Sequence, residues 1–222
     1  MKIVAVVFDM DGVLFDTERI GVQCWTEAAE PTGLQNAREI ARMCIGGTIP
    51  GTKEVFMEEA AKQGVALDFE KLHEDCARLI LEKEERDGLP VKPGVHEILE
   101  YLYERKIPVA LATSSKKDIV LSHLEKTGIT KYFRKIVTGD MVSHGKPAPD
   151  IYIKACEELE AAPENVIAIE DSFNGIRSAS AAGLHPIMVP DQLQPTEEIL
   201  LLAETKCDSL LEVRKLLQEK YL

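Results

Sequence analysis

Two aspartates, Asp9 and Asp11, stand two residues apart at the end of an apolar run that extends from Lys2 to Phe8. The run is short, rich in β-branched residues and followed by a turn signal, which predicts a buried strand. In an extended backbone this spacing places both carboxylates on one face. Their repulsion and loss of hydration call for a divalent cation, or for a proton on one of them. The pair therefore predicts metal-assisted chemistry with an aspartate as nucleophile.

The DxDG sequence from Asp9 to Gly12 has a second interpretation, since it also occurs in calcium loops and in plain turns. A calcium loop carries further oxygen ligands. Here Gly12 is followed by three apolar residues, Val13 to Phe15. The catalytic interpretation is therefore favoured.

Hydroxyl side chains follow a second apolar run, residues 107–112. Thr113 and Ser114 come first, and a hydroxyl beside free backbone N–H groups at the start of a helix can hold phosphate oxygens. Ser115 is expected to cap the next helix, with Asp118 as its capping-box partner. A capped helix without a phosphate site is the alternative interpretation.

Lys146 lies between Gly145 and Pro147 in a loop that precedes a predicted helix. An isolated lysine is most often solvated surface. A lysine held in a tight loop, however, can neutralise both a nucleophilic carboxylate and a transferring phosphoryl group. Lys146 is therefore a candidate for the same site.

Two more carboxylates, Glu170 and Asp171, end an almost wholly apolar run over residues 165–169. Burying such charges without compensation is costly, so a cation is expected beside them. Magnesium suits this position because it favours carboxylate and water oxygens. An acidic pair after a strand is common by chance, so this pair alone is a weak indication of a metal site.

The elements that position these residues alternate between strands and helices. Strand-like runs cover residues 3–8, 107–112, 135–138, 165–169 and 186–189. Helical patterns follow Gly94 and cover about 116–126, 150–160, 174–182 and 208–220. This order predicts an α/β protein, a Rossmann-like parallel sheet with helices on both faces. Such sheets bind ligands at the carboxyl ends of their strands, where the polar residues stand.

Residues 18–87 break this alternation, because they contain no convincing strand and are rich in Glu, Ala and Lys. Candidate helices cover residues 18–29, 36–44, 51–63 and 68–86. We therefore expect a catalytic core formed by residues 1–16 and 89–222, with residues 17–88 inserted as a helical cap domain.

The composition excludes several classes of protein. The chain of 222 residues has 26 Lys and Arg against 38 Asp and Glu, a formal charge of −12 that repels nucleic acid and anionic membranes. No apolar run approaches the length of a membrane span or of a signal peptide. The five cysteines show no CxxC spacing, so we expect reduced thiols in a cytoplasmic protein and no zinc site. The expected partner is a small phosphorylated metabolite, and the expected oligomeric state is a monomer.

Each of these signals has an ordinary alternative, but four of them occur in a fixed order, each after a predicted strand. The motifs DxDGVxxDTE, ATSS, GKPAPDIY and IEDSxxGIxSAxAAG together resemble the haloacid dehalogenase superfamily of phosphotransferases. The resemblance covers nearly all of the core, and the insertion stands where the family has its helical cap. Within the superfamily, the chain is similar to the branch of phosphatases and β-phosphoglucomutase.

This resemblance implies a role for each motif residue. Asp9 matches the nucleophile that becomes aspartyl phosphate, and Asp11 matches the general acid and base. Thr113, Ser114 and Lys146 match the groups that bind the phosphoryl oxygens. The implied cofactor is Mg²⁺, and its ligands match Asp9, the Asp11 carbonyl, Glu170 and Asp171, with Glu170 acting through water.

The choice between phosphatase and mutase depends on the insertion. Mutases of this branch carry a histidine where this chain has Gly21 and an arginine where it has Ile49. Both departures favour a phosphatase acting on a small phosphomonoester, with a sugar phosphate mutase as the alternative. A phosphonatase is less favoured, because the insertion shows no clear Schiff-base lysine, although Lys53 is near the expected place. A non-catalytic binding protein on the same fold is a further alternative, but it predicts a lost motif residue and none is lost.

Overall fold

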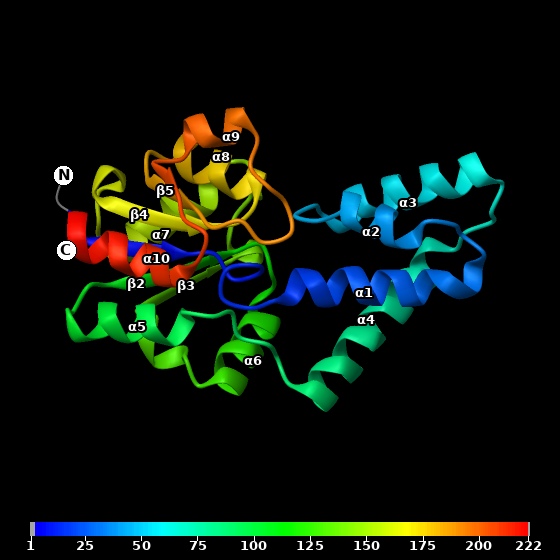
Figure 1. Ribbon diagram of the computed structural model, residues 1–222, viewed down its shortest axis with the longest axis horizontal. Coiled ribbons are helices and arrows are strands. Elements are labelled where there is room, and N and C mark those ends of the chain that lie inside the picture. The colour runs from blue at the N-terminus through cyan, green and yellow to red at the C-terminus, as the bar shows by residue number, and fades with distance from the viewer. Residues whose placement is uncertain (1–2, 222) are drawn as a thin grey trace. The chain divides into compact units, whose positions relative to one another are not determined.

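The computed structural model describes residues 3–221, so Lys2 at the start of the first predicted strand run lies outside the described part (Figure 1). The chain forms two compact units. One contains residues 3–15 and 91–221, and the other is Asp16–Pro90. In the first unit, Phe15 and Val91 form an isolated antiparallel bridge, so the chain leaves this unit and returns to it at adjacent positions.

The first unit is built on a six-stranded sheet in which every strand pair is parallel. The strand order is β3-β2-β1-β4-β5-β6. The strands are β1 Ala5–Phe8, β2 Val109–Thr113, β3 Lys135–Thr138, β4 Val166–Glu170, β5 His185–Met188 and β6 Thr205–Lys206. The predicted α/β fold and its five predicted strands are thus confirmed. The sixth strand was not predicted, because two residues are too few to show a hydrophobic period.

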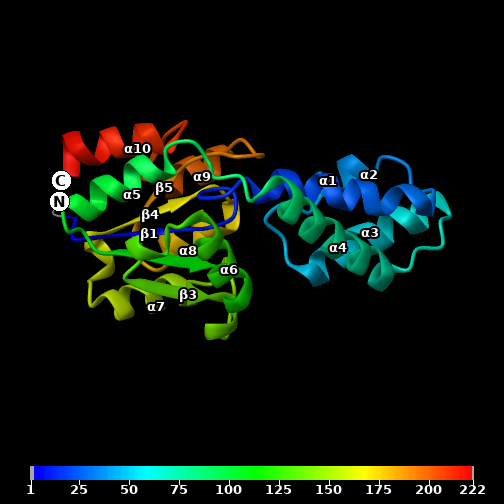
Figure 2. The same ribbon diagram turned by 90° about the horizontal axis from the view of Figure 1, so that it is seen from below.

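Helices cover both faces of this sheet, which explains why the central strands are apolar throughout. Strands β1, β2 and β4 are buried at every position. Figure 2 shows α5 and α10 on one side of the sheet and α7 on the other. The helices are α5 Val95–Glu104, α6 Lys117–Thr127, α7 Asp150–Leu159, α8 Phe173–Ala181, α9 Glu197–Leu202 and α10 Leu210–Leu216. Small residues of β1 and β2, such as Ala110 and Ala112, pack in one cluster with Tyr152 and Ala155 of α7.

The second unit is helical and has a hydrophobic core of its own. Its helices are α1 Thr17–Ala29, α2 Ala37–Met43, α3 Ile49–Gln63 and α4 Phe69–Asp87. Thr48 and Asp68 cap α3 and α4 by accepting backbone N–H groups of the first turn. Trp25 of α1 stacks on Phe69 of α4 within the core, with ring centroids 5.8 Å apart. All four predicted helices are present, so this unit folds around its own apolar faces.

Among residues 3–221, no helix combines the length and the apolar character that a membrane crossing requires.

Candidate active site

The carboxyl ends of β1, β2 and β4 meet at one edge of the sheet and bring the predicted residues together. Phe8, the last residue of β1, is in register with Leu111 of β2 and with Ile169 of β4. Asp9 therefore emerges between the ends of its two neighbouring strands. Asp9 is 7% exposed, and Thr113 and Glu170 at those ends are fully buried.

Lys146 reaches this edge from the loop that precedes α7. Its Nζ atom donates to Asp9 Oδ1 at 2.7 Å, to Glu170 Oε1 at 2.6 Å and to the Ala112 carbonyl at 3.1 Å. These three acceptors account for all three ammonium hydrogens. Lys146 is thus a buried counter-ion shared between two carboxylates rather than a solvated surface lysine.

Several contacts fix the loop that carries Lys146. The Ala148 N–H donates to the Gly145 carbonyl at 3.0 Å, and the buried Ser178 hydroxyl donates to the Ala148 carbonyl at 2.6 Å. His144 Nδ1 lies 2.9 Å from Asp150 Oδ1 at the other end of the loop. His144 is exposed, and this pairing ties the two ends of the loop together.

Glu170 accepts hydrogen bonds on both of its carboxylate oxygens. Its Oε1 accepts from Lys146 and from the Tyr152 hydroxyl, the latter at 2.9 Å. Its Oε2 accepts the backbone N–H groups of Asp171 and Ser172 and the Ser172 hydroxyl at 3.0–3.1 Å. Five donors on two oxygens fill the capacity of a carboxylate. Any role of Glu170 toward a metal therefore passes through water or requires one of these donors to leave.

Glycine is required twice around these carboxylates because backbone approaches them closely. A Cβ on Gly175, in the first turn of α8, would lie 1.7 Å from Glu170 Oε1. A Cβ on Gly12 would lie 2.1 Å from Asp171 Oδ2, and Gly12 also has a φ of +78°. Both positions exclude a side chain, so the acidic cluster can form only beside glycine.

Asp9, Glu170 and Asp171 each offer a carboxylate oxygen, and these atoms lie within 4.8 Å of one another. All three residues are buried. Two of the three carboxylates share the ammonium of Lys146, so a further cation beside the cluster would offset buried negative charge. An all-oxygen set of hard donors suits Mg²⁺, so the residues present fit the implied metal.

The pKa values of the site reflect its burial. Burial raises the pKa of Asp9, and the carboxylates of Glu170 and Asp11 raise it further, although Lys146 opposes the shift. Burial alone would lower the pKa of Lys146, but Asp9 and Glu170 together raise it above its usual value. The lysine therefore stays charged, and an additional positive charge beside Asp9 would favour the ionised form of that carboxylate.

The Asp11 side chain is held by hydroxyl groups from the segment after β2. Ser115 Oγ donates to Asp11 Oδ2 at 2.7 Å, and Thr113 Oγ1 lies 3.4 Å from the same oxygen. Thr113 Oγ1 also accepts the Ser115 N–H at 3.1 Å. The expectation that Ser115 caps the next helix is wrong, because α6 starts one residue later with Lys116 at its N-cap and no side-chain cap.

Ser114, predicted to bind phosphate, is exposed at the same sheet edge, between Thr113 and Ser115. Its carbonyl packs against Gly139, where an added Cβ would lie 2.3 Å from that oxygen. Ser115 and Tyr152, by contrast, were not predicted as site residues. The motifs ATSS and GKPAPDIY contain both residues, but only the orientation of their side chains shows which carboxylates they contact.

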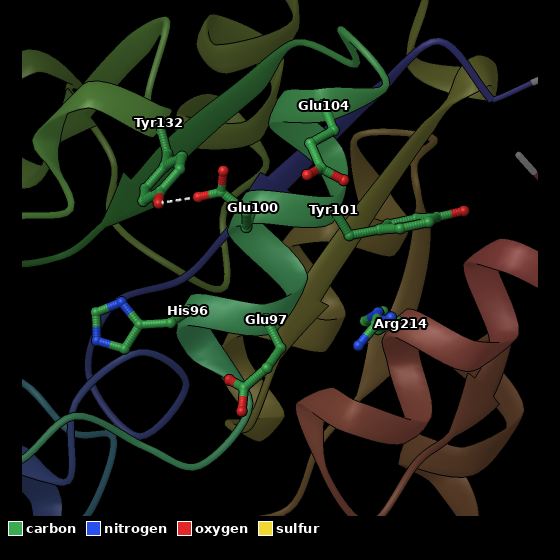
Figure 3. A pocket seen from close by; sticks show the side chains of 7 residues that line it. All are labelled: His96, Glu97, Glu100, Tyr101, Glu104, Tyr132 and Arg214. Atoms are coloured by element: carbon green, nitrogen blue, oxygen red, sulfur yellow. Dashed lines mark hydrogen bonds between the residues drawn. The ribbon is translucent and has the colours of Figure 1, made fainter.

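A hollow of about 410 Å³ lies away from this edge, over α5 and α10 (Figure 3). Figure 3 shows the Tyr132 hydroxyl bonded to Glu100 at its border. The lining residues are His96, Glu97, Glu100, Tyr101, Glu104, Tyr132 and Arg214. It contains none of the predicted site residues, so the candidate active site is the acidic cluster at the sheet edge.

Comparison with known proteins decides the family. The family model described as haloacid dehalogenase-like hydrolase matches residues 6–189. The chain belongs to this family. The predicted family and its hydrolase class are thereby confirmed.

Relatives and solved structures agree with this assignment. The phosphorylated carbohydrates phosphatase of Thermotoga maritima is 36% identical over 184 residues, which are 82% of this chain and 83% of the relative. Hexitol phosphatase A of Escherichia coli is 28% identical over 85% of this chain and 84% of its own. A crystal structure from Thermotoga maritima, of a protein provisionally named a beta-phosphoglucomutase, has a TM-score of 0.78 and 31% identity. The similarity covers 99% of this chain and 100% of that protein.

Proposed function

We propose that this protein is a magnesium-dependent phosphatase that hydrolyses a small phosphomonoester, a sugar or polyol phosphate, through an aspartyl phosphate on Asp9. The observation that carries the proposal is the buried ion pair between Lys146 and Asp9 beside the carboxylates of Glu170 and Asp171. A carboxylate held by a fixed ammonium is oriented for attack on a phosphoryl group. The names of the phosphatase relatives support the substrate class.

The reaction would proceed in two displacements. In the first, Asp9 attacks phosphorus, the bond to the substrate oxygen breaks, and Asp11 gives a proton to the leaving alkoxide. In the second, Asp11 takes a proton from water, whose oxygen attacks phosphorus and releases Asp9 and inorganic phosphate. Ser115 and Thr113 would hold Asp11 in place between the two steps.

The other residues would balance charge around the phosphoryl group. Lys146 would offset the charge on Asp9 and on the phosphoryl oxygens, which Thr113 and Ser114 would also bind. Asp9, Asp171 and the Asp11 carbonyl would hold Mg²⁺, with Glu170 contributing through water. The ion, when bound, supplies positive charge that offsets the carboxylates and the phosphate.

We further infer that the helical unit, Asp16–Pro90, acts as a cap that contributes substrate specificity and excludes water from the phosphorylated aspartate. Two positions in this unit favour hydrolysis over phosphate transfer between sugar hydroxyls. Gly21 in α1 has no side chain to handle a proton, and Ile49 at the start of α3 has no charge to clamp a second phosphate. The mutase remains the competing function because of the provisional name of one similar structure.

A phosphate-release screen tests the proposal. The protein, with magnesium, is incubated with sugar phosphates, polyol phosphates and nucleotides, and Asp9→Asn serves as the inactive control. We expect release from at least one sugar or polyol phosphate and none from the variant. Conversion of β-glucose 1-phosphate to glucose 6-phosphate, with a trace of glucose 1,6-bisphosphate and faster than any release of phosphate, would instead establish the mutase.

A further inference from the structure

We propose that Tyr152 is a positioning residue of this site, whose buried hydroxyl holds Glu170 so that Lys146 is shared between Glu170 and Asp9. The inference rests on the proposed function, which gives Asp9 and Lys146 their roles. Tyr152 acts through Glu170, and we assign it no contact with the reacting phosphoryl group.

Tyr152 contacts the two residues of the ion pair between Lys146 and Glu170. It lies in the first turn of α7, six residues after Lys146, and is fully buried. Its hydroxyl donates to Glu170 Oε1, the same oxygen that accepts from Lys146. The Lys146 ammonium also lies 5.1 Å from the centroid of the Tyr152 ring. One tyrosine thus contacts both Lys146 and Glu170.

The hydroxyl is a permanent donor and not an acid. Burial raises the pKa of Tyr152 well above its usual value, and the charge of Glu170 raises it further. A buried phenol of this kind keeps its proton and needs an acceptor. Glu170 is that acceptor, so the positive end of the O–H dipole faces the acidic cluster.

The consequence concerns how Lys146 divides its charge. Its distances to Glu170 and Asp9 are nearly equal, 2.6 and 2.7 Å. Oε2 of Glu170 is already held by three donors, so Oε1 is the oxygen on which the balance depends. Without the hydroxyl, the positive end of its O–H dipole would no longer offset the charge on Oε1, and Oε1 would attract Lys146 more strongly. Asp9 would then be less neutralised, and the electrostatic potential at the cluster would be more negative, although its net charge would not change.

Packing alone explains the ring of Tyr152 but not its hydroxyl. The ring belongs to the apolar cluster between α7 and the sheet, and phenylalanine would fill the same space. Tyr152→Phe therefore removes the hydrogen bond and leaves the packing in place. Tyr132→Phe is a matched control, since it removes a tyrosine hydroxyl that donates to a glutamate, Glu100, outside the candidate active site (Figure 3).

The experiment measures two affinities that a more negative site changes in opposite directions. Titration calorimetry gives the affinity for Mg²⁺ and, at saturating magnesium, for orthovanadate. In Tyr152→Phe we expect Mg²⁺ to bind severalfold more tightly and orthovanadate roughly tenfold more weakly, the size of one hydrogen bond to a charged group. We also expect kcat/KM to fall by roughly tenfold in the variant and to stay within about twofold in the control. Weaker binding of both ligands, or no change in either, would overturn the inference.

A ligand-free measurement keeps the inference testable if the proposed function fails. Urea midpoints of Tyr152→Phe, Glu170→Gln and the double variant form a cycle. We expect the two shifts to be non-additive, because Tyr152→Phe removes the donor of this hydrogen bond and Glu170→Gln removes the charge of its acceptor. Additive shifts would overturn the role of Tyr152 even in an active phosphatase. Absence of phosphatase activity in the wild type, with non-additive shifts, would count against the proposed function alone.

Discussion

At the scale of single residues, the site depends on charges that can exist in the interior only because they compensate one another. Asp9 and Glu170 share one lysine, and Glu170 accepts four further donors. Removing one member of such a network leaves its partners with unpaired charge, which costs more than an exposed ion pair would contribute. Substitutions that test this site should therefore keep the size and shape of the original side chain.

Asp9→Asn tests the nucleophile with minimal change of shape. We expect it to abolish turnover and to leave no phosphorylated protein, because an amide cannot form an acyl phosphate. Phosphate release and intact-protein mass spectrometry after a substrate pulse measure both. Asp118→Asn, at an exposed position of α6, is the control and should keep full activity. A phosphorylated Asp9→Asn protein would show that another residue is the nucleophile.

Asp11 and Ser115 test the acid and base together with the residue that orients it. Asp11→Asn should lower kcat by roughly a hundredfold or more, the usual contribution of a positioned acid or base. Ser115→Ala should lower kcat by roughly tenfold, because Asp11 loses its 2.7 Å hydrogen bond. Steady-state kinetics on the best substrate of the screen provide the comparison. An unchanged kcat in Ser115→Ala would refute the orienting role of Ser115.

At the scale of elements, apolar runs and their ends were the strongest guides to the fold. The order of strands and helices was predictable because buried parallel strands are continuous apolar segments. Strand β6 was not predictable, because Thr205 and Lys206 have neither length nor apolar character. The candidate site followed from the combination of Asp9 and Glu170 at the ends of two strands with Lys146 in the loop before α7, since no one of these signals is specific alone. The partners Ser115 and Tyr152 did not follow, because rotamers and loop paths decide their contacts.

The turn after β1 can be tested through its glycine. Gly12→Ala should lower the free energy of unfolding by about 2 kcal/mol or more, because a Cβ meets Asp171 and the backbone has a positive φ. Gly21→Ala, inside α1 with open space around an added Cβ, should instead raise it by about 0.5–1 kcal/mol. Urea unfolding of both variants measures the contrast. Equal stabilities of Gly12→Ala and wild type would refute the close contact with Asp171.

At the scale of the whole molecule, the acidic cluster links metal binding, pH and stability. The pKa of Asp9 in the metal-free fold is raised from its ordinary 3.8 to about 8, with burial as the main cause. Because the pKa is higher in the fold than in the unfolded chain, protonation of Asp9 stabilises the metal-free fold, and this contribution is complete below about pH 4. That contribution is lost as the pH rises through about 8. Magnesium offsets this loss because it binds the ionised carboxylate.

Magnesium should therefore raise the melting temperature more at pH 8.5 than at pH 6, where it must displace the proton on Asp9. Excess chelator should abolish both this stabilisation and the phosphatase activity. Differential scanning fluorimetry and phosphate release in the same buffers check the two effects. Asp9→Asn should lose the pH dependence of the magnesium effect. Full turnover in excess chelator would show that the reaction does not require the metal.

The bridge between Phe15 and Val91 has a consequence for how such a molecule can arise. Because the chain departs and returns at paired neighbours, the intervening 16–90 segment is a cassette whose removal leaves the sheet register intact. The inserted segment can then be altered without a change in the strands that carry Asp9 and Glu170. A chain in which a short glycine-rich turn replaces the cassette should still fold, as amide exchange protection of β1 and β4 would reveal.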